Sequence, residues 1–271
     1  MAAPLLVLVP PSEAKTPGGT LQGSVGTFDD ALGDERRRVI EALIGAVNRS
    51  TTRRQEILLN ARGPLLERAL ETMKHLGDER VPRFAAWQRY SGVVWSHLDP
   101  ASLATTLRRR LLIPSSLYGV TTAEDRIADF RLKMNVGIPP LGTMATFWKP
   151  KITTVLAAHS KRSTIVNLLP LEHEAAIDVG ELMRTRDVVR VQFINGVGGT
   201  TVGHDAKAVK GILARTLLIE GLEALQSFEW QGWRSVPVNG DFHIVSPAQR
   251  TLDGWVTKAK KAEDQTLRGM T

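Results

Sequence analysis

Cysteine is absent from the 271 residues of this chain. Its absence excludes disulfides, thiolate zinc sites, iron–sulfur clusters held by cysteine and peroxidase chemistry that uses a thiol nucleophile. Long apolar runs are missing too, since none approaches the roughly 18 residues that a transmembrane helix needs. The apolar start MAAPLLVLVP has no basic region before it and ends in two prolines, unlike a signal peptide. We therefore expect a cytoplasmic protein with no membrane partner.

The charge balance is basic on an otherwise ordinary composition. Hydrophobic residues make up 42% of the chain and charged residues 23%, as in a typical globular protein. The formal net charge is +7 at neutral pH. Such an excess favours polyanionic partners, either nucleic acid or phosphorylated small molecules, but it indicates nothing about the fold. A basic surface without a dedicated cleft is the equally open alternative.

Strand-like and helix-like patterns alternate along the chain. Short apolar runs bounded by proline or polar residues predict buried strands at 4–10, 110–116, 163–169 and 187–194. Helical spacing of apolar residues predicts helices at 35–48, 51–60, 63–76, 100–110 and 205–225, with a helical turn or short helix at 121–130. We expect a single α/β domain, a mixed sheet flanked by helices, over residues 1–250. A charged tail follows at 251–271.

Several boundaries have recognisable signals. Candidate N-caps precede three of the predicted helices, namely Asp34, Asp99 (with Pro100 at the first helical position) and Asp205. Asn239 and Gly240 predict the turn of a β-hairpin over 233–246. The arginine triplets at 36–38 and 108–110 are interpreted as solvated helix faces.

The glycine-rich stretch NGVGGTTVGHDAKAVKG, residues 195–211, raises the question of a phosphate-binding loop. Gly198 and Gly203 have the separation found in P-loops, but His204 and Asp205 stand where a lysine and a hydroxyl residue are required. Residues 200–204 alternate like a strand, so a hairpin turn between 187–194 and 200–204 accounts for the glycines better. We interpret the glycines as a turn.

Five other blocks carry a resemblance to a known family. In chain order they read PPSEAKTPGG (10–19), SSLYGVTTAEDRIADFRLKM (115–134), FWKPKI (147–152), IVNLLPLEHEA (165–175) and HDAKAVKGILAR (204–215). Together they resemble the YaaA peroxide-stress family of bacterial proteins over roughly residues 5 to 250. The resemblance implies an α/β fold with a basic cleft, DNA binding through a helix-hairpin-helix element, and survival of hydrogen peroxide through lowered free iron.

The sequence departs from the family pattern at four positions. Thr122 stands where proline is usual, and Phe130 replaces the tyrosine before Arg131. Pro170 and His173 replace the serine and tyrosine of an S-x-EY block. These changes touch a candidate site and indicate a specialised relative.

Candidate DNA- or anion-binding residues come from four of the five blocks. They are Ser12, Lys15, Tyr118, Gly119, Arg131, Lys149, Lys207, Lys210 and Arg215. Lys207, Lys210 and Arg215 fall on neighbouring positions of one predicted helix, with Lys207 in a first turn whose amides already favour an anion. A solvated helix face is the alternative. Gly211 beside them indicates close packing or close approach of a ligand.

An enzyme is the second hypothesis. Lys15 and Glu172 both follow predicted strands, and ligands gather at the carboxyl ends of strands in α/β sheets. In this interpretation Glu172 is the general acid or base, and Lys15, Arg131 and Lys210 hold the phosphate or carboxylate of a nucleotide-like or other anionic small molecule. Glu172 could equally be an ion-pair partner of one of these cations.

The turn at Tyr118 and Gly119 fits the helix-hairpin-helix pattern only loosely, because Thr121 replaces its second glycine. A strand-to-helix turn capped by Thr121 or Thr122 is the alternative.

Two further groups are expected to be structural. Trp87, Tyr90 and Trp95 could stack on bases, although core packing explains them better. His173 and His204 lack the spacing of a metal site, so no metal or cofactor is expected.

Overall fold

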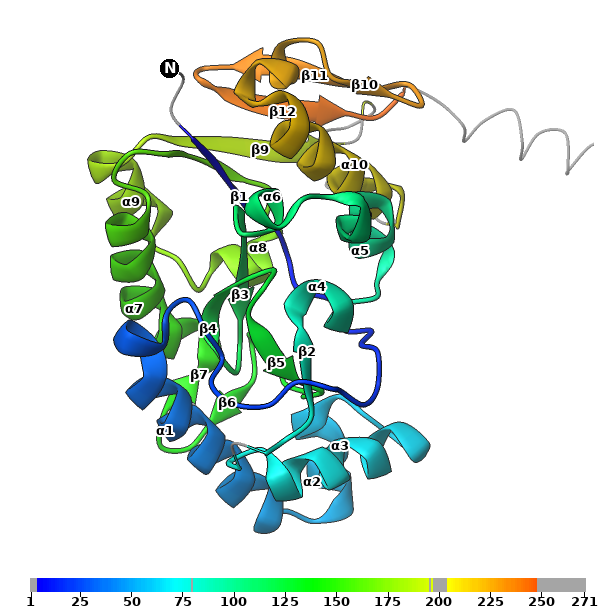
Figure 1. Ribbon diagram of the computed structural model, residues 1–271, viewed down its shortest axis with the longest axis vertical. Coiled ribbons are helices and arrows are strands. Elements are labelled where there is room, and N and C mark those ends of the chain that lie inside the picture. Colours follow the sequence, from blue (N-terminus) through cyan, green and yellow to red (C-terminus); the bar gives the residue numbers. More distant parts are fainter. Residues whose placement is uncertain (1–3, 79, 195, 197–203, 248–271) are drawn as a thin grey trace, which may run out of the picture.

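A mixed eight-stranded sheet runs through the computed structural model, which describes residues 4–78, 80–194, 196 and 204–247 (Figure 1). Its strand order is β10-β11-β12-β9-β8-β1-β3-β4. Its strands are β1 (Leu5–Leu8), β3 (Leu111–Ser115), β4 (Gly119–Thr122), β8 (Thr164–Asn167), β9 (Val188–Ile194), β10 (Glu229–Trp230), β11 (Trp233–Val238) and β12 (Asp241–Val245). Two small sheets pair β2 (Arg83–Ala85) with β5 (Arg126–Ala128) and β6 (Gly137–Ile138) with β7 (Gly142–Thr143).

Helices surround the sheet. They are α1 (Asp29–Asn48), α2 (Thr52–Leu59), α3 (Pro64–His75), α4 (Ala86–Arg89), α5 (Val93–Leu98), α6 (Thr105–Arg108), α7 (Met144–His159), α8 (Leu171–Glu174), α9 (Val179–Thr185) and α10 (His204–Glu220), with 3-10 turns η1 (Pro100–Ser102) and η2 (Leu222–Gln226). In Figure 1, α7 and α9 stand on one side of the sheet, and α5 and α10 pack together on the other. The expected α/β fold with a mixed sheet flanked by helices is confirmed.

Three of the parallel strands are buried on both faces, which is why continuous apolar runs predicted them. β12, β9, β8, β1 and β3 are successive parallel neighbours, whereas β4 and β11 run antiparallel beside them. Every residue of β1, β3 and β8 is buried, as expected for strands covered on both faces. Because these strands share a direction, their carboxyl ends lie along one edge of the sheet. The segments that follow them meet at that edge.

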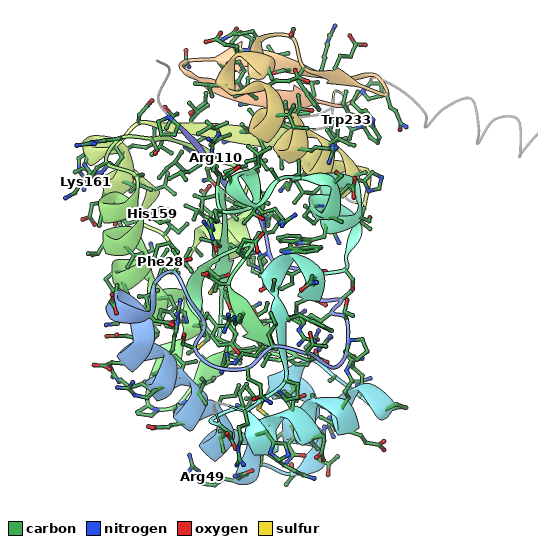
Figure 2. The ribbon with its side chains drawn as sticks, viewed as in Figure 1. Phe28, Arg49, Arg110, His159, Lys161 and Trp233 are labelled. Atoms are coloured by element: carbon green, nitrogen blue, oxygen red, sulfur yellow. The ribbon has the colours of Figure 1, made fainter. Side chains whose placement is uncertain are left out.

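Side chains from distant helices complete the core (Figure 2). Phe28 before α1 and His159 at the end of α7 meet edge to face, with ring centroids 5.1 Å apart. Tyr90 and Trp95 are buried, and Trp87 is partly buried. Core packing of these three aromatics is therefore confirmed, and base stacking by Tyr90 and Trp95 is excluded by their burial.

The segment 121–130 is not helical, which corrects the sequence prediction. It contains the end of β4 and all of β5. The buried Asp125 carboxylate accepts hydrogen bonds from the Thr27 hydroxyl at 2.6 Å and from the Thr122 amide at 2.8 Å. These bonds fix a turn that a helix would not allow. A proline at position 122 could not donate the second bond, so threonine suits this relative.

Tyr118 and Gly119 occupy a β-hairpin between β3 and β4, and both earlier interpretations of this turn are wrong. Ser115 pairs with Gly119, and no helix follows directly. Gly119 has a φ of +75°, and a Cβ there would lie 2.8 Å from the Trp148 ring. Tyr118 is fully buried, and its hydroxyl accepts a hydrogen bond from the Ala128 amide at 3.2 Å. Neither residue is accessible to DNA.

Helix boundaries differ from the predictions in three places. α1 begins at Asp29 rather than after Asp34, because acidic residues in its first turn favour the helix N-terminus and Asp29 also accepts from the Gly26 amide. The predicted helix 100–110 is broken into η1 and α6, and the Asp99 side chain makes no capping hydrogen bond. α10 begins at His204, which places Asp205 inside it, and ends before Gly221, where φ is +88°.

Other boundaries agree with the sequence. The hairpin β11–β12 turns at Asn239 and Gly240, both with positive φ. The predicted glycine turn at 195–199, apart from Gly196, residues 200–203 of the predicted strand 200–204, and the tail at 251–271 lie outside the described residues. His204, the last residue of that predicted strand, begins α10 instead. Both edges of β9 are paired with parallel strands, β8 and β12.

Two arginines from the triplets that were predicted to be solvated are covered by other residues. Arg36 is 3% exposed, donates to the carbonyl oxygens of Tyr118 and Val120 at 2.9 Å each, and pairs with Asp29. It therefore ties α1 to the β3–β4 hairpin. Arg108 is also largely covered, paired with Glu124 and stacked 4.7 Å from the Trp87 ring centroid.

Candidate functional site

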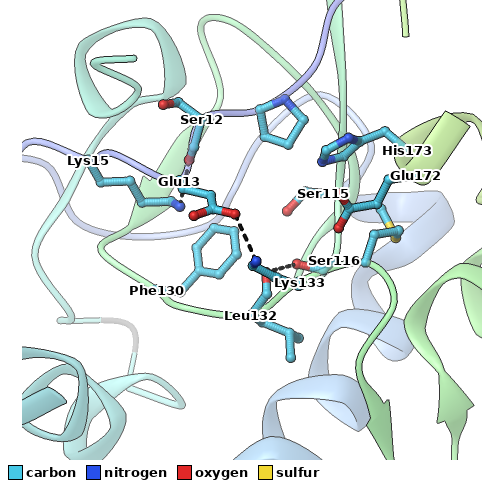
Figure 3. Close-up of a pocket in the computed structure, with 12 residues that line it drawn as sticks. Ser12, Glu13, Lys15, Ser115, Ser116, Phe130, Leu132, Lys133, Glu172 and His173 are labelled. Carbon is cyan, nitrogen blue, oxygen red and sulfur yellow. Dashed lines mark hydrogen bonds and ion pairs between the residues drawn. The ribbon is translucent and has the colours of Figure 1, made fainter. Parts of the chain in front are cut away.

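A cavity of about 60 Å³ opens at the carboxyl edge of the parallel strands (Figure 3). Its walls come from the segments after β1, β3, β5 and β8. They are formed by Pro11, Ser12, Glu13, Lys15, Ser115, Ser116, Phe130, Leu132, Lys133, Met134, Glu172 and His173. The topology places ligands at this edge in α/β sheets generally.

Lys15 forms one wall of the cavity. Its Nζ donates to the Ser12 carbonyl oxygen at 2.9 Å and lies 4.7 Å from the Phe130 ring centroid and 5.5 Å from that of Tyr90. It forms no ion pair with any residue that the structure describes. Desolvation of the ammonium, with the Arg131 cation beside it, lowers the pKa of Lys15 to about 7.

Two more cations stand next to Lys15, and one carboxylate partly balances them. Arg131 Nη1 donates to the Glu13 carbonyl oxygen at 2.8 Å, so Arg131 and Lys15 bind consecutive backbone carbonyls. Lys133 Nζ lies 3.1 Å from a carboxylate oxygen of Glu13. Asp129 is engaged elsewhere, 3.0 Å from Arg68 Nε. Glu13, paired with Lys133, and Asp129, paired with Arg68, are the carboxylates that act on Lys15, so the three cations on this side of the cavity are only partly balanced.

The opposite wall belongs to α8, which follows β8. Figure 3 shows Glu172 and His173 across the cavity from Lys15. Glu172 is exposed, and it forms no ion pair within the described part of the chain. His173 Nδ1 is buried without a hydrogen-bond partner. Desolvation and the charge of Lys210 lower the pKa of His173 to about 4, so this ring is neutral at physiological pH.

Lys210 lies behind this wall. It is 8% exposed, with Nζ 4.7 Å from the Phe193 ring centroid near the end of β9. Desolvation lowers the pKa of Lys210 to about 8. Its charge acts on His173, but it does not line the cavity. Lys210 therefore contributes positive charge from behind the residues that line the cavity.

The predicted site residues divide into two sets. Ser12, Lys15 and Glu172 line one cavity, and Arg131 adjoins it. Lys149 on α7 and Lys207 on α10 are exposed and do not line it. Arg215 is bound to the Asp99 and Ser102 region, with Nη1 2.6 Å from the Ser102 hydroxyl, so the predicted cationic face of α10 does not form a single site.

Gly211, in the same helix, serves close packing. A Cβ there would lie 2.3 Å from the Val94 carbonyl oxygen and 2.9 Å from the Leu98 amide nitrogen, both in α5. No space is left for a ligand at this point, so close helix packing is the correct alternative.

Sequence reasoning missed several walls of the cavity. Glu13 lies between the predicted residues Ser12 and Lys15, and Ser115 lies near the end of the predicted strand 110–116. The rule that ligands gather at the carboxyl ends of strands, which pointed to Lys15 and Glu172, therefore applies to both. Two departures from the family pattern, Phe130 and His173, also line the cavity. Each replaces a tyrosine of that pattern, so the walls here carry fewer hydroxyl groups.

Replacing Lys15 with methionine is expected to stabilise the protein by about 1–2 kcal/mol below neutral pH, discounted for partial exposure. The folded pKa of about 7 lies below the ordinary 10.5, so between these values the unfolded chain binds more protons. Stability of the wild type therefore rises with pH through this window, and the advantage of K15M shrinks. Urea unfolding across the window measures this; a constant difference between the two proteins would contradict the lowered pKa.

In the ranges 4–78, 80–194 and 204–247, no three histidine, aspartate or glutamate side chains gather as a metal site would require. Within those ranges no helix has the length and apolar character needed to cross a membrane.

Known proteins are similar in sequence to this chain over most of its length. A family model described as peroxide stress protein YaaA matches residues 5–238. A UPF0246 protein of Streptomyces coelicolor is 29% identical over 254 residues, covering 87% of this chain and 95% of the relative. A UPF0246 protein of Corynebacterium efficiens is 31% identical over 233 residues, covering 83% and 89%. The resemblance read from the sequence blocks is confirmed: the chain belongs to the YaaA peroxide stress protein family.

Proposed function

We propose that this protein binds a small phosphate- or carboxylate-bearing anion in the cavity beside Lys15. The observation that carries the proposal is the unbalanced positive charge there: Lys15 forms no ion pair among the described residues, and Arg131 binds only backbone carbonyl oxygens. A partly desolvated cation without a counter-ion is costly, and an anionic ligand would supply the missing partner. The family name adds peroxide stress as the physiological setting.

The size of the cavity favours a small ligand over duplex DNA. At about 60 Å³ it is far below the few hundred Å³ typical of sites for drug-sized ligands. A nucleic-acid surface needs several exposed cations that follow a phosphate backbone. Of the predicted DNA-binding residues away from the cavity and its rim, Tyr118, Gly119 and Lys210 are buried and Arg215 is held by Ser102. This leaves Lys149 and Lys207 exposed on separate helices.

Thermal-shift titrations with phosphate, oxalate and pyruvate, at ionic strength matched with sodium chloride, test the proposal. We expect saturable stabilisation of the wild type by at least one of these anions, because a ligand that binds only the folded state raises its stability. K15M should bind that anion about 10- to 100-fold more weakly, since a charge-assisted hydrogen bond contributes about 1.5–3 kcal/mol.

The matched control is Lys149→Met, which removes an exposed lysine outside the cavity. Its affinity for the anion should equal that of the wild type. Equal binding by K15M and the wild type would overturn the proposal. The DNA alternative is measured in parallel by anisotropy of labelled duplex across a salt series: tight, salt-dependent binding that K149M weakens and K15M retains would favour it instead.

A further inference from the structure

We propose that Lys15 is a nucleophile that forms an imine with the carbonyl group of a small anionic carbonyl compound, such as a 2-oxo acid. This inference rests on the proposed anion binding and names the substrate class of the same cavity. It assigns the cations distinct roles: Lys15 attacks the carbonyl carbon, while Arg131 holds the acidic group.

The surroundings of Lys15 are those of an amine that need not stay protonated. Its Nζ lies near the faces of Phe130 and Tyr90, and its one hydrogen bond in the described structure goes to a neutral acceptor, the Ser12 carbonyl oxygen. Arg131 and Arg89 oppose its charge, whereas Asp129 and Glu13 favour it without forming an ion pair. Lysines become nucleophilic in this way, desolvated in an apolar pocket or beside another cation.

The neighbouring groups suit the rest of such a reaction. Arg131 adjoins the cavity and is near enough to Lys15 for its charge to act on the amine, so an acid group bound to the guanidinium would lie beside Nζ. Across the cavity, His173 has a buried Nδ1 with no hydrogen-bond partner in the described structure. The Ser115 hydroxyl lines the cavity and accepts a hydrogen bond from the Tyr118 amide at 3.2 Å. His173 and Ser115 can therefore carry protons to and from the substrate oxygen.

The chemical step balances without an outside oxidant or reductant. The Nζ lone pair forms the C–N bond as the C=O π pair moves to oxygen, which takes up a proton and becomes the hydroxyl of a carbinolamine. The nitrogen lone pair then forms C=N as the C–O bond breaks, and the oxygen leaves as water with a second proton. Overall, two hydrogens pass from the amine to the released water.

Lys210 provides an internal comparison. It is also buried, close to an aromatic ring, and has a lowered pKa, but it does not line the cavity. If desolvation alone made a lysine reactive, both Lys15 and Lys210 should be labelled. If labelling requires a carbonyl compound bound in the cavity, only Lys15 should be labelled.

Borohydride trapping tests the inference. The full-length protein is incubated with pyruvate and sodium cyanoborohydride, which supplies hydride to an imine and leaves a stable secondary amine. Intact and peptide mass spectrometry should find one adduct, on Lys15. It should form about 1,000-fold faster near neutral pH than on an ordinary exposed lysine, because a far larger fraction of the amine is neutral. K15M should lose the adduct, and Lys210→Met should retain it.

The outcomes separate this inference from the proposed function. Suppose that pyruvate stabilises the wild type, but neither pyruvate nor dihydroxyacetone phosphate gives an adduct on Lys15. This result would overturn imine formation and leave the proposed anion binding intact. Labelling spread over surface lysines and unchanged in K15M would also overturn it. If phosphate, oxalate, pyruvate and dihydroxyacetone phosphate all fail to stabilise the protein, and neither carbonyl compound is trapped, both proposals are wrong.

Discussion

Gly211→Ala is expected to destabilise the protein by about 3 kcal/mol, although alanine is the better helix former by about 1 kcal/mol. The new methyl carbon would lie 2.3 Å from the Val94 carbonyl oxygen and 2.9 Å from the Leu98 amide nitrogen. Both are backbone atoms of α5, so no side-chain rotation can make room. Relief requires α10 and α5 to move apart, which opens one of the most closely packed helix pairs in the fold.

The matched control is Gly33→Ala in α1. Gly33 is also inside a long helix, but a Cβ there would meet nothing within 4 Å. The same substitution should therefore stabilise the protein by about 0.5–1 kcal/mol. Urea unfolding of both variants measures the difference in sign. A stabilised Gly211→Ala variant would show that the α5–α10 contact is not as close as described.

Local pattern was enough to predict the buried strands. β1, β3 and β8 read as apolar runs because both of their faces are covered, and no partner needs to be known to see this. The hairpin at Asn239 and Gly240 was equally visible, because its turn depends on residues that accept positive φ.

Where the decisive contact is distant in sequence, the prediction was wrong. The segment 121–130 has helix-like spacing, but Asp125 is bound by Thr27, 98 residues earlier in the chain. Arg36 is predicted to be solvated because it stands in a charged triplet, yet its hydrogen-bond acceptors lie at Tyr118 and Val120. Tertiary partners of this kind override local propensity.

The candidate site follows the same division. Lys15 and Glu172 were predicted because both follow parallel strands, and topology alone brings such positions to one edge. The cationic face of α10 was predicted from helical spacing, which cannot reveal that Arg215 is held by Ser102 and Asp99. Spacing locates a side chain on its own helix and leaves its partner undetermined.

Arg89→Met is expected to cost about 3–5 kcal/mol of stability, because several buried carbonyl oxygens would lose their donor at about 1–3 kcal/mol each. Arg89 is fully buried. Its guanidinium donates to the carbonyl oxygens of Thr16, Gly18 and Ile127, the Gly18 bond being 2.7 Å long. One side chain thus ties the loop after β1 to β5, and methionine would leave these buried acceptors without their donor.

The loss should extend to the cavity, because Lys15 belongs to the same loop. The Arg89 carbonyl accepts from the Thr16 amide at 2.9 Å, and Lys15 itself pairs with Tyr90 in an isolated bridge. With the loop released, both anion binding and pyruvate trapping should fall, even where the remaining fold persists. Arg89→Lys should recover little, since a single ammonium cannot reproduce the planar fork.

Arg80→Met supplies the comparison for this variant. Arg80 is 83% exposed and pairs with Asp78 on the surface, so its loss should change stability by no more than about 0.5 kcal/mol. Urea midpoints of the three arginine variants, read with thermal-shift titrations of the anion, separate a structural from an electrostatic role. If Arg89→Met were as stable as Arg80→Met, the loop after β1 would be held by its backbone pairing alone. The position of Lys15 would then not depend on Arg89.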